Sequence, residues 1–169
     1  MSPRIKLNAT GLEIFPLCLG GNVFGWTANE TESFKVLDAF AEAGGNFIDT
    51  ADVYSEWAEG NSGGDSETII GKWMASRGNR HEMVIATKVA KYSKRPGLSA
   101  ANINSAIEES LNRLQTDHID IYYAHEDDQK VELLETLTAF DSLVKAGKVH
   151  IMGASNYSAS RLDEATKLS

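Results

Sequence analysis

The chain lacks several features that would define other classes of protein. Its 169 residues include one cysteine, Cys18, so no disulfide can form within the chain. No apolar run approaches the roughly 20 residues that a membrane span needs. The start, Met1 to Lys6, has no long apolar centre of the kind found in secretory signals. We therefore expect a cytoplasmic protein with no membrane partner.

Positive charge is also scarce. The chain has 16 lysines and arginines against 24 acidic residues, a net charge of -8. This balance argues against a general affinity for nucleic acid or for an anionic membrane surface. Apolar residues make up 42% of the chain, which is ordinary for a globular protein, so we expect one domain spanning residues 1-169. No metal site is predicted.

The apolar pattern predicts an α/β fold. Segments 5-7 and 13-15 flank a polar stretch with Gly11 and predict a β-hairpin. Five apolar strands then alternate with amphipathic helices, and the strands start near residues 16, 46, 83, 118 and 149. Apolar strands separated by helices indicate a parallel sheet covered on its faces. Both a doubly wound sheet and a (β/α)8 barrel satisfy this pattern.

Polar residues before the helices and between them predict local structure. We expect helix N-caps at Asn29 with Glu32, at Asp65 or Ser66, at Ser99, and at Ser158 or Ser160. The first strand, 16-19, is expected to be buried. The loop from Ser55 to Gly64 is long, small and polar, which makes it a candidate lid over a site.

Reactive side chains follow three of the predicted strands. Asp49, Lys88 and His125 each close a different strand, and Tyr54 lies five residues beyond Asp49. The carboxyl ends of parallel strands meet at one edge of a sheet, so these four side chains can converge. A phenol is a weak acid at neutral pH, and a neighbouring ammonium group favours its ionised form. The set predicts a site that protonates a carbonyl oxygen while its carbon is attacked.

Each of these residues, taken alone, has an ordinary structural explanation. A loop tyrosine such as Tyr54 is most often an amphipathic packing residue. Lys88 suits a structural ion pair with Asp49 or Asp52. A single aspartate suits a loop cap, and a single histidine suits a hydrogen-bonded rim position. The catalytic interpretation rests on four such residues at successive strand ends.

Four segments together resemble the aldo-keto reductase family. They are Phe47-Ile48-Asp49-Thr50-Ala51-Asp52-Val53-Tyr54, Ile85-Ala86-Thr87-Lys88, the stretch from Leu114 to His125, and Gly153-Ala154-Ser155-Asn156-Tyr157. The resemblance spans essentially the whole chain. It implies a (β/α)8 TIM-type barrel, of which this chain holds the N-terminal five βα units behind its hairpin.

The resemblance also implies a reaction. It is the reduction of an aldehyde or ketone to an alcohol by hydride transfer from NADPH, with NAD as the alternative cofactor. Tyr54 would donate the proton, Lys88 would assist it, Asp49 would pair with Lys88, and His125 would orient the carbonyl. The implied cofactor contacts are Gly21, Asn22, Val23, Asp49, Ser155 and Asn156. Trp26 and Trp57 would line the substrate mouth, although packing is the commoner role for such residues.

The chain departs from that family in length. A barrel of this type has about 250 residues and eight strands, and the family's last three units carry the ring-stacking aromatic and the basic residues for the adenosine phosphate. Open strand edges favour self-association. We therefore expect the 169 residues alone to be weakly active or inactive. Three explanations of the length stay open: the chain is part of a longer protein, the missing half comes from another chain, or the protein is degenerate and has no turnover. Glu126 makes the pocket more polar than in many relatives. The alternative function is a non-catalytic nicotinamide-binding regulatory module resembling potassium-channel β subunits.

Overall fold

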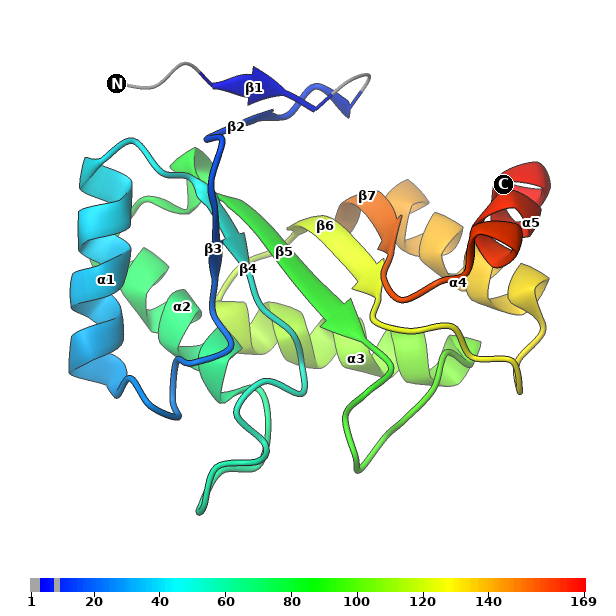
Figure 1. Cartoon of the computed structure of the whole chain (residues 1–169), viewed down its shortest axis with the longest axis horizontal. Coiled ribbons are helices and arrows are strands. Elements are labelled where there is room, and N and C mark those ends of the chain that lie inside the picture. Colours follow the sequence, from blue (N-terminus) through cyan, green and yellow to red (C-terminus); the bar gives the residue numbers. More distant parts are fainter. Residues whose placement is uncertain (1–3, 8–9) are drawn as a thin grey trace.

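The computed structural model describes residues 4-7 and 10-169. Strands β1 (Ile5–Lys6) and β2 (Glu13–Ile14) form the predicted antiparallel hairpin, with Ile5 opposite Ile14. Figure 1 shows the hairpin across the end of the main sheet at which the parallel strands begin. Ile14 packs there against Val84, Ala86 and Ile121 and so covers that end of the sheet.

The main sheet has five parallel strands in the order in which they occur along the chain. They are β3 (Cys18–Gly20), β4 (Phe47–Asp49), β5 (Val84–Val89), β6 (Ile119–Ala124) and β7 (Val149–Ala154). In a doubly wound sheet the strand order reverses at a switch point. Here each described strand pairs with the next one, so the arrangement is that of a barrel wall, open between β3 and β7.

Five helices form a layer against this wall (Figure 1). They are α1 (Glu30–Glu42), α2 (Asp65–Arg77), α3 (Ala100–Leu114), α4 (Leu133–Lys145) and α5 (Ala159–Leu168), with a short 3-10 turn, η2 (Arg80–Glu82), before β5. Each helix packs against the next one along the chain. The core between helices and sheet holds large buried side chains, including Trp73, Tyr122, Phe140 and Leu37. Among the described residues, no helix is both long and apolar enough to cross a bilayer.

Three of the predicted helix caps are confirmed. Asn29 and Glu32 form a capping box at α1, Ser99 accepts a hydrogen bond from the backbone of Asn102, and Ser158 does the same for Arg161.

The predicted cap of α2 is wrong. Its N-cap is Gly64, with φ of 76° and no side-chain cap, while the Asp65 carboxylate accepts a hydrogen bond from the backbone of Gly63. A Cβ at Gly64 would lie 2.4 Å from the Arg113 side chain. The left-handed backbone and the close approach of α3 therefore favour a glycine at position 64. The helix begins after this glycine, and neither Asp65 nor Ser66 is its N-cap.

The predicted burial of the first strand is also wrong. Strand β3 has only three residues, Cys18 is exposed, and Leu17 just before it keeps 61% of its surface exposed. In the described part of the chain β3 pairs with β4 alone, so one of its edges has no neighbour. The open strand edge is accordingly short on this side of the sheet.

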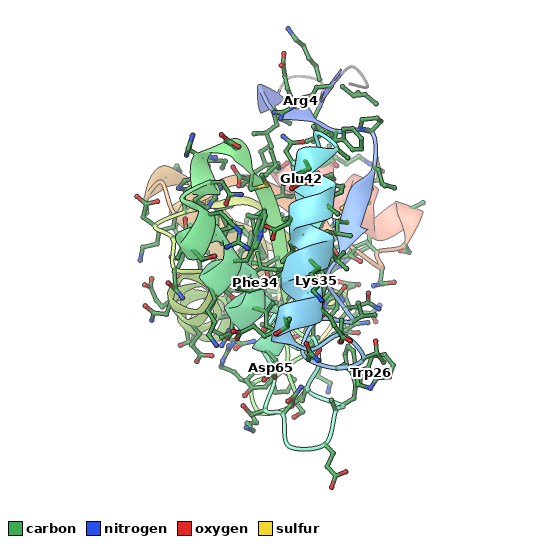
Figure 2. All side chains as sticks on the ribbon, turned by 90° about the vertical axis from the view of Figure 1, so that its left-hand side faces the viewer. Arg4, Trp26, Phe34, Lys35, Glu42 and Asp65 are labelled. Carbon is green, nitrogen blue, oxygen red and sulfur yellow. The ribbon has the colours of Figure 1, made fainter. Side chains whose placement is uncertain are left out.

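The loops at the carboxyl ends of the strands gather at one end of the molecule. Figure 2 shows Trp26 and Asp65 at that end and Arg4 of the hairpin at the other, with α1 running between them. Side chains from different loops are therefore brought together far from the hairpin.

Candidate active site

Three of the four predicted reactive side chains meet at the carboxyl end of the sheet. Asp49 ends β4, Lys88 lies near the end of β5, and Tyr54 lies in the loop after β4. The Lys88 ammonium is 2.6 Å from the Asp49 carboxylate and 2.9 Å from the Tyr54 hydroxyl. The proximity expected from the strand pattern is therefore present, while the catalytic roles of these residues stay a prediction.

The ammonium group of Lys88 is buried and fully hydrogen-bonded. It donates to the Asp49 carboxylate, to the Tyr54 oxygen and, at 2.7 Å, to the carbonyl of Thr50, so each of its three N–H groups has an acceptor. A buried charge needs such partners. Of the two ion-pair partners that the sequence allowed, Asp49 is the one in contact.

The hydroxyl of Tyr54 accepts a hydrogen bond from Lys88, which leaves its own proton free to be donated. Within the cluster the nearest acceptor for that proton is the Asp49 carboxylate at 3.4 Å, a long hydrogen bond. The backbone next to Tyr54 is anchored, because Ser55 has φ of 70° and its hydroxyl donates to the carbonyl of Phe24. The proton is thus available to an incoming oxygen.

His125 lies directly after β6 and beside the tyrosine. The two ring centroids are 5.9 Å apart, edge to face. Burial, together with the positive charges of Lys88 and Lys91, lowers the pKa of His125 to about 4, so the imidazole is neutral at pH 7. Its Nδ1 has no hydrogen-bond partner among the described residues. The unpartnered Nδ1 is itself buried, so it is the neutral ring beside Tyr54, and not this atom, that suits contact with a substrate oxygen.

The first predicted cofactor segment lies beside Asp49. The backbone N–H of Gly21 donates to the carbonyl of Asp49 at 2.7 Å. A Cβ at Gly21 would come within 2.8 Å of the Ser66 hydroxyl, so the absence of a side chain lets the two segments approach. Asn22 is exposed and Val23 is half-buried.

The second predicted cofactor segment lies beside His125. Asn156 donates from its amide to the carbonyl of His125 at 2.8 Å and to the Ser155 hydroxyl at 3.0 Å. It adopts a left-handed conformation, with φ of 58°. The two segments therefore flank the reactive cluster from opposite sides, and their role in cofactor binding stays a prediction.

Two tryptophans stand next to Tyr54. Trp26 and Trp57 each keep 51% of their surface exposed, which does not fit core packing. Their rings meet edge to face at 5.7 Å, and Trp57 lies 6.2 Å from the Tyr54 ring. The candidate lid that carries Trp57 is tied to the loop of Trp26, because Asn61 donates to the carbonyl of Gly25 at 2.6 Å.

Sequence reasoning missed a buried polar group behind the site. Asp52 is 1% exposed, and neither of its carboxylate oxygens has a partner in the described part of the chain. Burial first, and the negative charge of Glu67 second, raise the pKa of Asp52 to about 7. Glu67 itself is paired with Arg113 at 2.6 Å. Thr87, a polar residue within an apolar strand, donates to Glu67 and is the one signal that the sequence offered.

Comparison with known proteins agrees with this architecture. An uncharacterized oxidoreductase of Bacillus subtilis is 40% identical over 168 residues, which cover 94% of this chain and 51% of that protein. An aryl-alcohol dehydrogenase [NADP(+)] of Phanerodontia chrysosporium is 38% identical over 86% of this chain and 42% of its own length. The chain thus spans about half the length of these curated relatives.

A solved structure shows the same fold. An aldo-keto reductase of Bacillus halodurans superimposes on 99% of this chain with a TM-score of 0.84 and 31% identity, and the match covers 54% of that protein. The five-stranded wall is accordingly part of a TIM-type barrel. The family model for the aldo/keto reductases matches residues 16–169. This chain therefore belongs to the aldo/keto reductase family.

Proposed function

We propose that this chain carries the proton-transfer site of an NADPH-dependent reductase that converts an aldehyde or ketone to an alcohol. The observation that supports it most is the Lys88 ammonium, which contacts Tyr54 and Asp49 at once and leaves the phenol proton available. When bound, the nicotinamide supplies a hydride to the carbonyl carbon. Tyr54 then delivers its proton to the carbonyl oxygen.

The surroundings favour that proton transfer. As the proton leaves, negative charge develops on the Tyr54 oxygen, 2.9 Å from a cation that is 7% exposed. A preformed charge in a site with little water stabilises such a change more than a solvated one does. Asp49 holds the ammonium in position, and the neutral ring of His125 orients the substrate oxygen.

The residues present fit the nicotinamide end of the cofactor. Exposed polar groups of Asn22 and Asn156 stand on the two flanks of the cluster, and Ser155 lies beside Asn156. The name of the Phanerodontia relative supports NADP over NAD. We expect weak cofactor binding and little turnover from the 169 residues alone, because they span about half of their relatives. A cytoplasmic location and self-association through the open strand edges belong to the same proposal.

The test replaces the phenol by a phenyl ring. Tyr54→Phe is made in this chain alone and in this chain joined to the remaining part of the Bacillus halodurans reductase, with Tyr92→Phe as the matched control. Turnover of aromatic aldehydes, followed by NADPH oxidation, should fall by about 100-fold or more in Tyr54→Phe and stay unchanged in the control. Unchanged turnover in Tyr54→Phe would remove this residue from the mechanism.

The alternative is a nicotinamide-binding module without turnover. Trp26 and Trp57 provide a fluorescence signal beside the site. Quenching by NADPH with no oxidation of the cofactor, in the joined protein and with a range of aldehydes and ketones, would support the module over the reductase.

A further inference from the structure

A second cluster lies at the opposite end of the sheet, where the strands begin. His118 immediately precedes β6, Asp120 lies within β6, and His150 lies in the neighbouring strand β7. One nitrogen or oxygen atom from each residue can be chosen so that all three lie within 4.8 Å of one another. None of these residues contacts the proposed active site, so the cluster needs a separate explanation.

The carboxylate of Asp120 is held firmly and has one oxygen to spare. It is 5% exposed, and its Oδ2 accepts hydrogen bonds from the Arg80 guanidinium and from the backbone N–H of Ile85, both at 2.8 Å. Its Oδ1 lies 3.5 Å from Nδ1 of His150. The carboxylate is therefore fixed by its other oxygen, while Oδ1 is turned toward an imidazole.

The two histidines have the surroundings that metal-binding imidazoles need. Nδ1 of His118 is 2.7 Å from the Asp117 carboxylate, and a proton shared there leaves the lone pair on Nε2. A carboxylate behind a histidine is the usual way in which proteins orient a ligating ring. The His118 and His150 rings stack at 4.7 Å with 25° between their planes.

We infer that His118, Asp120 and His150 form a binding site for a divalent transition metal ion of the Zn²⁺ class. Two imidazole nitrogens and one carboxylate oxygen are ligands that Zn²⁺ accepts, and three protein ligands leave one position for water. At bond lengths of about 2.0–2.2 Å the ligand atoms sit about 3.4 Å apart. From separations of up to 4.8 Å the ligand atoms must therefore approach one another by up to about 1.4 Å. The 28% and 48% exposed rings of His118 and His150 can do this by turning.

Neighbouring positive charge does not block this site. The Arg80 guanidinium is bound to Oδ2 of Asp120, the oxygen that the metal would not use. The ammonium of Lys148, adjacent in sequence to β7, is paired with Glu108. A metal ion here would tie the open-edged strand β7 to β6. It would also go beyond the sequence-based expectation, which included no metal site.

The test uses Zn²⁺ and Co²⁺ on the full chain in a Cys18→Ser background, because Cys18 is an exposed thiol that could bind these ions by itself. Calorimetry should show one Zn²⁺ per chain. Co²⁺ should give the visible absorption of a low-coordinate site, and Zn²⁺ should raise the melting temperature because it binds the folded form. The absence of saturable binding at millimolar Zn²⁺ would overturn the inference.

Variants locate the ion without reference to any enzyme activity. His150→Ala should lose the binding, and Asp117→Asn should weaken it by about 10-fold because the orienting carboxylate is gone. His81→Ala is the matched control, since His81 is an exposed histidine beside Glu82 and outside the cluster. Equal affinity in His150→Ala and His81→Ala would overturn the site.

A measurement on the unmutated rings guards against a variant that merely misfolds. In the NMR spectrum, Zn²⁺ should move the imidazole resonances of His118 and His150 and leave those of His81 and His125 in place. Shifts at His81 or His125 without shifts at His118 and His150 would contradict the assignment.

Discussion

Asp49 and Asp52 lie three residues apart in the same segment, yet their surroundings differ completely. The Asp49 side chain is 26% exposed and accepts a hydrogen bond from the Lys88 ammonium at 2.6 Å. Asp52 is 1% exposed and has no hydrogen-bond partner among the described residues, so burial and the charge of Glu67 raise its pKa to about 7. One carboxylate is paired with a cation, and the other is left to neutralise itself by protonation.

The difference arises from which acidic residues the nearby cations pair with. Arg113 and Arg95 are the positive charges that act on Asp52, but Arg113 is bound by Glu67 and Arg95 by Glu109. Lys88 points instead toward Tyr54, with Asp49 beside it. Depth in the protein therefore does not decide which acid is paired. The proposed chemistry benefits, because the Lys88 ammonium contacts the phenol as well as Asp49.

The largest effect on turnover is expected when the cation that pairs with Asp49 is removed. Lys88→Met removes the cation that stabilises a developing phenolate, so turnover in the protein joined to the Bacillus halodurans part should fall by about 100- to 10,000-fold. Lys91→Met is the control, because that lysine follows the same strand but pairs with Glu126. Steady-state assays compare the two variants. Equal losses would mean that general positive charge, rather than the contact with Tyr54, matters.

The unpaired carboxylate of Asp52 should make the free energy of unfolding depend on pH. Unfolded Asp52 loses its proton near pH 3.8 and folded Asp52 near pH 7, so the folded form binds the extra proton between these values. Stability due to this group falls as pH rises through that window, by about 4 kcal/mol in total at most. Asp52→Asn should remove this loss and gain over wild type at alkaline pH. Urea unfolding across the pH range measures it, and an unchanged slope would contradict the unpaired state.

His125 should produce a slope of the opposite sign. Its pKa is about 4 when folded and 6.5 when unfolded, so the unfolded form binds the extra proton between these values. Stability due to His125 therefore rises with pH through that window, by about 3 kcal/mol in total. In His125→Gln the free energy of unfolding should keep the falling pH dependence due to Asp52. In Asp52→Asn it should keep the rising pH dependence due to His125.

The two opposing slopes overlap between about pH 4 and pH 6.5, where each has a magnitude of about 1.4 kcal/mol per pH unit. In this window the pair should nearly cancel in the wild-type chain. The double variant Asp52→Asn/His125→Gln should match the wild-type slope there while both single variants depart from it. A single variant whose slope equals that of the double variant would show that the group it retains titrates normally, and equal slopes in both single variants would show that neither pKa is shifted.

Much of the candidate site could be predicted from the sequence, because it depends on backbone direction. Parallel strands wound in one sense bring Asp49, Lys88 and His125 to one edge whatever the details of packing. The caps at Asn29, Ser99 and Ser158 could likewise be predicted, since each depends on residues three apart in the chain.

What could not be predicted depends on contacts between distant segments. The isolation of Asp52 arises because Glu67 of α2 and Arg113 of α3 pair with each other. The cap at Gly64 follows from the same approach of Arg113. Leu17 is exposed just before β3, which has a neighbour on one edge only among the described strands, and no local pattern records this. Local sequence patterns predict backbone direction and helix caps well. They do not predict which charged side chains of neighbouring helices pair with each other.

The smallest effect is expected at an ion pair that has neither burial nor a shared partner. Lys145 and Asp141 lie 2.6 Å apart on α4, with side chains 76% and 52% exposed. Water and salt screen such a pair, so Lys145→Gln should change the free energy of unfolding by no more than about 0.5 kcal/mol. Urea unfolding at low and high salt measures this, with Lys88→Met as the buried counterpart. A larger loss at Lys145, persisting in high salt, would mean that distance between charges matters more than the solvent around them, and the contrast between Asp49 and Asp52 would then need another cause.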